Sequence, residues 1–202
     1  LKRNMNRLLH VDVEAMTAVV QPGIVTAELN AELASHGLFW PPHTSTLNRA
    51  TVGGMISTDA AGKGSLVYGR AHRHVERLVM LLDDGTEWTA EPVTEDEAER
   101  RANEPGRGGQ LWRALLDMTI PEAANLGLPE LARGFSGYGL DRLRVDGRVN
   151  PIALVCGAEG TLGILVEATI SLSPIPDLTR LVVASYDTFG DALEDAVALR
   201  ET

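Results

Sequence analysis

Two glycine-rich segments of this chain have the residue types to hold a ligand through the backbone. The first, TVGGMISTDAAGKGSLVYG, runs from Thr51 to Gly69, and the second, GAEGTLG, runs from Gly157 to Gly163. Glycine allows positive φ and lets a ligand approach where a Cβ would collide, at a cost in conformational entropy. Backbone N–H groups in such turns can bind phosphate oxygens. The two segments therefore predict a site, built from backbone atoms, for a phosphate-bearing ligand.

The familiar glycine-rich phosphate motifs are absent from the sequence. A Rossmann fingerprint needs G-x-G-x-x-G between a strand and a helix, whereas Gly62 and Gly64 have no third glycine at that spacing. A Walker A loop, G-x-x-x-x-G-K-[ST], is absent too. What remains is two separate glycine segments flanked by β-like runs, which can enclose a long, flat, phosphate-bearing ligand. Flavin adenine dinucleotide (FAD) has that shape.

Three stretches carry a specific family resemblance. They are PPHTSTLNRATVGGMISTDAAGKGSLVYGRAHRHVERLVMLLDDGTEW, then SGYGLDRL, then CGAEGTLGILVEATISLSPIP. Together they closely resemble the FAD-linked oxidases of the para-cresol methylhydroxylase or vanillyl-alcohol oxidase type, over about residues 5–176. Within that family the likeness is to D-lactate and D-2-hydroxyacid dehydrogenases, including those that carry an additional iron–sulfur region. The resemblance implies an α+β FAD-binding domain of two subdomains, with its N-terminal part incomplete and FAD in the groove between them.

The resemblance also implies which residues bind FAD. The segment from Pro42 to Thr46 runs beside the flavin, and Thr51, Gly53 and Gly54 wrap the pyrophosphate and ribityl region. The implied FAD-binding residues are Pro42, His43, Thr46, Thr51, Gly53, Gly54, Thr58, Asp59, Ala60, Gly62, Gly69, Glu159, Gly160, Gly163 and Ile164. In the turn that matches the family's TNAGG, Asp59 replaces the usual Asn and Ala61 replaces a Gly. No catalytic residue and no metal ligand is assigned.

Two parts of the family pattern are missing from the sequence. The first phosphate-binding loop lies upstream of the MNRLLHVD strand in the family, and the substrate-binding cap follows about residue 177. We therefore expect a fragment, with residues 1–176 forming the FAD-binding domain and residues 177–202 starting the cap domain. The base that removes the hydroxyl proton should lie on the cap. We expect the isolated chain to bind FAD weakly and to turn over no substrate.

The implied function is a flavin-dependent dehydrogenase that oxidises a D-2-hydroxy acid by hydride transfer to FAD. Electrons then pass to a separate acceptor, for which an iron–sulfur region of the same full-length protein is one option. The first alternative is an FAD-dependent oxidase of another alcohol or a sugar. The second is a non-catalytic domain that keeps the fold without FAD, an alternative raised by Asp59 and Ala61.

Composition excludes several other classes of protein. The 202 residues carry a net charge of −10 and no basic cluster, which argues against nucleic acid or an anionic membrane surface as a general partner. The single cysteine, Cys156, excludes an internal disulfide and a cysteine-rich metal site, and we expect it on a buried strand. No apolar run approaches the roughly 20 residues that span a bilayer. These features predict a cytoplasmic protein, with peripheral association with the inner face of the membrane as an alternative.

The elements that must position the glycine segments follow from apolar spacing and turn residues. Thr26 stands at the expected N-cap of a helix that Gly37 ends. The remaining expectations in the first half are paired strands within 8–23, extended chain over 38–50, a β-hairpin over 74–90 and a charged, solvated loop with one helical turn over 91–109. In the second half they are a helix from 110, strands over 152–156 and 164–172, and a strand then a helix over 180–202.

Some polar residues beside the glycine segments are further candidates. His72 and His74 have the spacing of metal ligands on a strand, but no carboxylate or cysteine completes a site, so we expect them to be exposed to solvent. The other candidates for contacting phosphate or a substrate are Lys63, Arg70, Arg133 and Tyr138.

Overall fold

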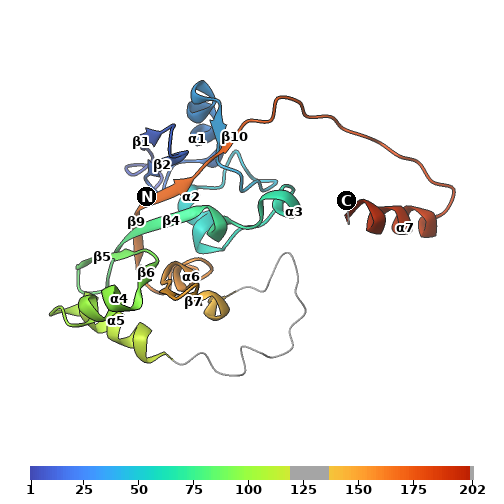
Figure 1. The fold of residues 1–202 in the computed structure, drawn as a ribbon. Coiled ribbons are helices and arrows are strands. Elements are labelled where there is room, and N and C mark those ends of the chain that lie inside the picture. Colours follow the sequence, from blue (N-terminus) through green and yellow to red (C-terminus); the bar gives the residue numbers. More distant parts are fainter. Residues whose placement is uncertain (119–136, 201–202) are drawn as a thin grey trace.

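The computed structural model describes residues 1–118 and 137–200, and it is built around a five-stranded antiparallel sheet of order β1-β2-β9-β4-β5 (Figure 1). The strands are β1 (Leu8–Asp12), β2 (Thr17–Val20), β3 (Leu38–Phe39), β4 (Val75–Leu81), β5 (Glu87–Ala90), β6 (Val93–Thr94), β7 (Arg144–Val145), β8 (Arg148–Val149), β9 (Ile164–Ser171) and β10 (Ser173–Pro174). The helices are α1 (Thr26–Leu33), α2 (Val52–Ser57), α3 (Ser65–Tyr68), α4 (Glu95–Ala102), α5 (Arg107–Asp117), α6 (Ile152–Val155) and α7 (Phe189–Arg200), with the 3-10 turns η1 (Ala34–His36), η2 (Ala71–His74) and η4 (Leu140–Arg142).

One face of the central sheet carries the main hydrophobic core. Alternate residues of β4 and β9 are buried, as expected for strands with one covered face. Helices α1, α2 and α6 contribute to the same buried cluster, so they pack against that face. Since α2 lies inside the first glycine segment and α6 directly precedes the second, the core holds both segments against one sheet.

Trp40 fixes the chain between α1 and the first glycine segment. Its side chain is fully buried, and its indole N–H donates a hydrogen bond to the carbonyl of His74 (3.4 Å). Its backbone N–H donates to the side-chain oxygen of Asn30 on α1 (2.8 Å). Because Trp40 is anchored in the core, it fixes the position from which the Pro42 to Thr46 segment begins.

The predicted strand pairs and the first helix are confirmed, with one difference at the helix start. Strands β1 and β2 pair, β4 and β5 form the hairpin, and Gly37 takes the left-handed conformation (φ 70°) that ends the helical region. The N-cap is Val25 rather than Thr26. The Thr26 hydroxyl is buried and donates to the carbonyl of Ala50 (3.1 Å). This bond ties the start of α1 to the chain that enters the first glycine segment.

The expectation of a loop over residues 91–109 is wrong for its central part, which forms α4. The Thr94 hydroxyl accepts a hydrogen bond from the N–H of Glu97 (3.3 Å), which caps the helix. Acidic residues fill the first turn and arginines the last, an order that the helix dipole favours. The two alanines Ala98 and Ala102 are buried, so a short apolar stripe sufficed to fold a charged sequence.

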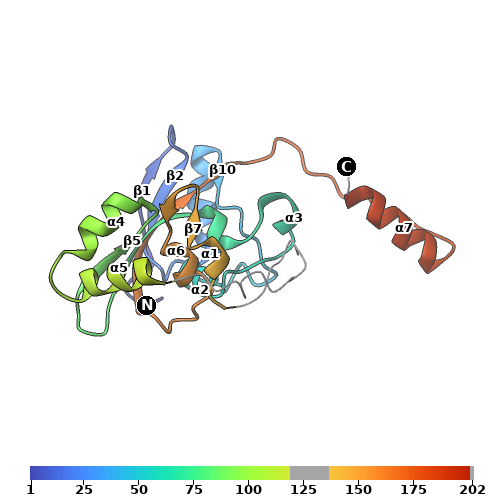
Figure 2. The same ribbon diagram turned by 60° about the horizontal axis from the view of Figure 1, so that its bottom comes forward.

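Two expected strands are also absent from the described chain. Residues 152–155 form α6, because an apolar run this short suits a buried helix as well as a strand, and Pro151 immediately precedes it. Cys156 is buried, as expected, but it ends this helix and does not lie on a strand. Residues 180–186 have no regular structure, and Figures 1 and 2 show this stretch extending away from the sheet before the expected helix, α7.

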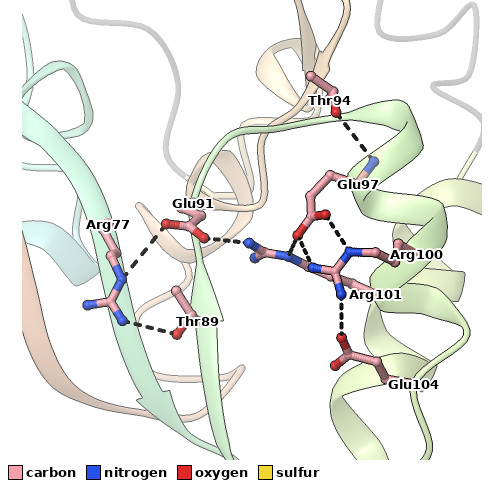
Figure 3. A network of polar contacts seen from close by, with 8 residues as sticks. All are labelled: Arg77, Thr89, Glu91, Thr94, Glu97, Arg100, Arg101 and Glu104. Carbon is pink, nitrogen blue, oxygen red and sulfur yellow. Dashed lines mark hydrogen bonds and ion pairs between the residues drawn. The ribbon is translucent and has the colours of Figure 1, made fainter.

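Helices α4 and α5 form a small second core beside β5 (Figure 2). Ion pairs join this unit to the sheet (Figure 3). Arg101 on α4 pairs with Glu91 (2.7 Å) and with Glu97 (2.6 Å), and its guanidinium lies over the ring of Trp112 on α5. Glu91 also pairs with Arg77 on β4 at 3.8 Å. Glu91 is therefore the carboxylate that connects the sheet to α4.

We predict that Glu91→Gln weakens the attachment of α4, since it removes the carboxylate shared by two arginines. The expected loss in the free energy of unfolding is about 0.5–1 kcal/mol, because both partners are only partly buried, and it should shrink at high salt. Urea unfolding at two salt concentrations measures it. Glu104→Gln is the matched control, because Glu104 pairs only with Arg100 on the exposed side of α4. Equal losses for the two variants would contradict the prediction.

Candidate cofactor site at the two glycine segments

The first glycine segment folds into two short helices, α2 and α3, rather than a bare loop. Thr51 caps α2 by accepting a hydrogen bond from the N–H of Gly54 (3.2 Å). The N–H groups of Val52 and Gly53 donate to the carbonyls of Ile24 (2.9 Å) and Pro22 (2.8 Å). The first donors of α2 are therefore used within the protein.

Adjacent glycines in this segment have different environments. A Cβ on Gly53 would lie 2.6 Å from Cβ of Pro22 and 2.9 Å from its carbonyl oxygen, so Gly53 is required by packing. A Cβ on Gly54 would meet only the Thr51 hydroxyl, at 3.2 Å, and one on Gly160 would have no atom within 4 Å. Gly54 and Gly160 are thus the glycines that leave space on the outside of the protein.

The structure brings the second glycine segment against the end of α2. The N–H of Glu159 donates to the carbonyl of Ser57 (2.9 Å), and the N–H of Gly157 donates to the carbonyl of Ile56 (3.3 Å). Glu159 has a left-handed backbone (φ 51°), which is uncommon for a residue other than glycine. Segments about 90 residues apart in sequence therefore share backbone hydrogen bonds, and Gly160 lies one residue beyond this contact.

Backbone donors remain open on three segments around this contact. The N–H groups of Thr46, Ala61 and Gly160 have no hydrogen-bond partner within residues 1–118 and 137–200. Several predicted site residues beside them are exposed to solvent: His43, Thr46, Gly54, Thr58, Glu159, Gly160 and Ile164. Open donors beside glycines without neighbours are what a pyrophosphate-bearing ligand requires.

Asp59, at the end of α2, lies where the segments meet. Its side chain is almost fully buried and its backbone is left-handed (φ 45°). The carboxylate accepts hydrogen bonds from the backbone N–H and the ring Nδ1 of His72, both at 2.9 Å, and pairs with Arg70 (3.1 Å) and Arg142 (3.7 Å). Burial alone would raise the pKa of Asp59, but the bonds from His72 and the charges of His72 and Arg70 outweigh it and hold the pKa below its ordinary value.

The expectation that His72 and His74 are exposed strand residues is wrong. Both lie on η2 and are partly buried. His74 Nε2 donates to the carbonyl of Tyr68 (2.8 Å), which anchors the end of α3. Burial and the nearby charges of His72 and Arg73 lower the pKa of His74, despite the opposing effect of the Tyr68 carbonyl. Within the described residues, no group of three His, Cys, Asp or Glu side chains could hold a metal ion.

The remaining predicted residues lie around this centre. Pro42 is buried, and a Cβ on Gly62 would overlap the carbonyl of His43, so the Pro42 to Thr46 segment packs directly on the first glycine segment. The carbonyl of Ala60 accepts the N–H of Ala71 (3.0 Å), and Gly69 has a positive φ (79°). Gly163 and Ile164 lie farther along, at the start of β9 beside Leu81, the last residue of β4.

Four further candidates have different outcomes. Lys63 is exposed, and Arg70 is engaged by Asp59. The hydroxyl of Tyr138 is 2.8 Å from that of Thr161 in the second glycine segment, so a hydrogen bond joins Tyr138 to this segment. Arg133 lies outside the described residues.

Sequence reasoning missed Arg142 and the partners of Asp59. Asp59 itself could have indicated these partners, because the family pattern has Asn at this position and a buried Asp requires cationic partners.

A separate groove of about 510 Å³ lies between β5 and helices α4 and α5, away from the glycine segments. Trp88, Trp112, Arg77, Arg101 and Arg107 line it, together with several carboxylates. The three arginines are paired with Glu91, Glu97, Glu167 or Asp83, so among the described residues that line the groove no cation is unpaired. None of the predicted site residues lines it. Within the described residues, no helix has the length and apolarity to cross a membrane.

Comparisons with known proteins match this chain to one family and to several relatives. Residues 1–91 match the family described as FAD binding domain. D-2-hydroxyglutarate dehydrogenase of Pseudomonas putida is 44% identical over 98% of this chain, and glycolate oxidase subunit GlcD of Bacillus subtilis is 29% identical over 96%. The chain spans only 20% of the first relative and 31% of the second. A solved alkyldihydroxyacetonephosphate synthase superposes with a TM-score of 0.55 over 87% of this chain and 23% of its own, at 22% identity, which supports the α+β fold.

We predict that alanine destabilises the protein at one of the two adjacent glycines of α2 and has little effect at the other. Gly53→Ala should lower the free energy of unfolding by about 1–3 kcal/mol, because its methyl group would overlap Pro22. Gly54→Ala should stay within about 1 kcal/mol of wild type, since that position is open and helical. Chemical denaturation of both variants tests this. A stable Gly53→Ala protein would show that Pro22 moves aside.

A second prediction concerns acid stability. The pKa of Asp59 is lowered in the folded state, so its contribution to stability is present above the ordinary pKa of 3.8 and is lost as the pH falls through the folded-state value. Asp59→Asn should therefore be less stable than wild type at neutral pH, and the difference should narrow below about pH 4. Thermal unfolding from pH 7 to pH 3 measures this, and a difference independent of pH would contradict it.

Proposed function

We propose that this chain, whose residues 1–91 match the family described as FAD binding domain, is the cofactor-binding part of an FAD-dependent dehydrogenase that oxidises a D-2-hydroxy acid. Relatives named D-2-hydroxyglutarate dehydrogenase at 32–44% identity over nearly the whole chain support this substrate class. They are longer proteins, of which this chain spans about a fifth.

The observation that carries the proposal is the contact between the two glycine segments. The N–H of Glu159 on the carbonyl of Ser57 places Gly160 near the end of α2. Open N–H groups of Thr46, Ala61 and Gly160 then lie on three neighbouring segments. Such donors can bind a pyrophosphate without a basic side chain, which suits a chain with a net charge of −10.

The chain's own residues have a binding and positioning role in this proposal. Bound FAD would supply the hydride acceptor, and the protein would fix its orientation relative to the hydroxy acid. Gly54 and Gly160 would leave space for the cofactor, and Thr46 and Thr58 are exposed residues with hydroxyl groups. No residue of this chain is assigned as the base. A separate electron acceptor and a cytoplasmic location belong to the same proposal.

We further propose that residues 177–202 begin a second domain that contributes to the substrate site. Leu181, Val182 and Val183 are more than 80% exposed in an extended stretch, and Phe189 of α7 is equally exposed. Four apolar side chains in water are unfavourable unless another surface covers them. The extended stretch over residues 180–186, followed by α7, leaves these side chains available to pack against another part of the protein.

Gly54→Val should abolish FAD binding while the protein stays folded, because the branched side chain would fill the space left for the cofactor. FAD is titrated into the full polypeptide that carries these residues, and binding is followed by flavin fluorescence. The matched control is Gly190→Val on α7, another helical glycine with open space around it. Undiminished affinity in a folded Gly54→Val protein would remove Gly54 from the site.

Activity separates the candidate functions. The FAD-loaded protein is assayed with D-2-hydroxyglutarate and D-lactate, using an artificial electron acceptor or oxygen. Reduction of the artificial acceptor supports the dehydrogenase. Turnover with oxygen, or only with another alcohol or a sugar, supports an oxidase. A protein that binds no FAD supports the non-catalytic alternative, which Asp59 and Ala61 raise by departing from the family pattern.

A further inference from the structure

We propose that Asp59 is a positioning residue, whose carboxylate sets the spacing of the two glycine segments without contacting FAD. Every hydrogen-bond or ion-pair partner of this carboxylate within the described chain is a donor or a cation. His72 supplies two N–H groups at 2.9 Å, Arg70 lies at 3.1 Å and Arg142 at 3.7 Å. A side chain that is 3% exposed and surrounded in this way has no free direction toward a ligand. This role differs from the cofactor contact that the resemblance implies.

The partners of Asp59 come from separate parts of the fold. Arg70 and His72 follow the first glycine segment, and the Arg70 guanidinium also donates to the backbone carbonyl of Asp59 (3.0 Å). Arg142 lies on η4, after SGYG. A Cβ on Gly157, at the start of the second glycine segment, would lie only 3.7 Å from Cβ of Asp59. One carboxylate therefore connects three segments around the contact.

The chemistry of the cluster requires a carboxylate. A carboxylate offers only acceptors, whereas an asparagine would turn an NH₂ group toward at least one of these donors. Arg142 is the partner with the fewest alternatives. Its Nη1 is buried without a hydrogen-bond partner in the described residues, and its other carboxylate contact, Asp141, is exposed and 3.8 Å away. Asp59 and Arg142 therefore form an ion pair at a position where the family pattern has a neutral asparagine in place of Asp59.

Backbone hydrogen exchange of the apo-protein tests this directly. The N–H groups of Gly157 and Glu159 report on the contact, because they donate to Ile56 and Ser57. Asp59→Asn should speed exchange at these two groups by about ten- to hundred-fold, the range expected for lost hydrogen bonds to a charged group. Exchange in the paired region of β4 and β9 should speed up much less, by the smaller factor that the overall loss of stability of this variant sets. Arg142→Gln should act at the same two groups, and the double variant should show less than the combined effect.

Asp141→Asn is the matched control, because it removes the other carboxylate near Arg142 and should leave both groups unchanged. If Asp59→Asn fails to fold, Arg142→Gln alone decides the outcome. Unchanged exchange at Gly157 and Glu159 would overturn the proposal, since Asp59 would then not hold the second glycine segment against α2. A uniform increase throughout the sheet would also overturn it, since Asp59 would then contribute only to the overall stability of the protein.

The consequence for the cofactor rests on the function proposed above. FAD titration should show that Asp59→Asn weakens binding by about the same factor as it speeds exchange. If the exchange result holds and the wild-type protein binds no FAD, the proposed function fails while the positioning role stands. If Asp59→Asn alters exchange and leaves FAD affinity unchanged, the spacing does not control cofactor binding and this inference fails.

Discussion

The contact between the end of α2 and the second glycine segment is the constraint on which the site depends. Strands β4 and β9 are antiparallel, so the first segment enters the sheet at one end of this pair and the second enters at the opposite end. Strand pairing alone would therefore separate them. Two backbone hydrogen bonds, from Gly157 and Glu159 to α2, bring the second segment back across the core. The two segments therefore meet at the end of α2.

Packing and ligand binding make different demands on the glycines, and the structure separates the two. Gly53 and Gly62 lie against protein backbone, so their lack of a side chain serves the fold. No protein backbone lies where a Cβ of Gly54 or Gly160 would be, so a ligand could occupy the space beside these two glycines. A glycine-rich sequence alone does not distinguish these cases, because close approach by the protein and by a cofactor select the same residue.

The sequence predicted the parts of the fold that depend on local pattern. Alternating apolar residues located β4, β5 and β9, and helical spacing located α1 and α5. It failed at α4, where two buried alanines and a Thr94 cap outweigh a highly charged composition, and at α6, where four apolar residues fit either a strand or a helix. The site residues came from family resemblance. The cluster around Asp59 could not be found that way, because it depends on Arg142, 83 positions away.

The central claim is that one FAD molecule lies across both glycine segments. Hydrogen exchange of the full polypeptide with and without FAD tests it most directly, at the open N–H groups of Thr46, Ala61 and Gly160. We predict that FAD slows exchange at all three, while residues 106–109 at the start of α5, which line the separate groove, are unaffected. Protection limited to that groove, or to only one of the glycine segments, would contradict it.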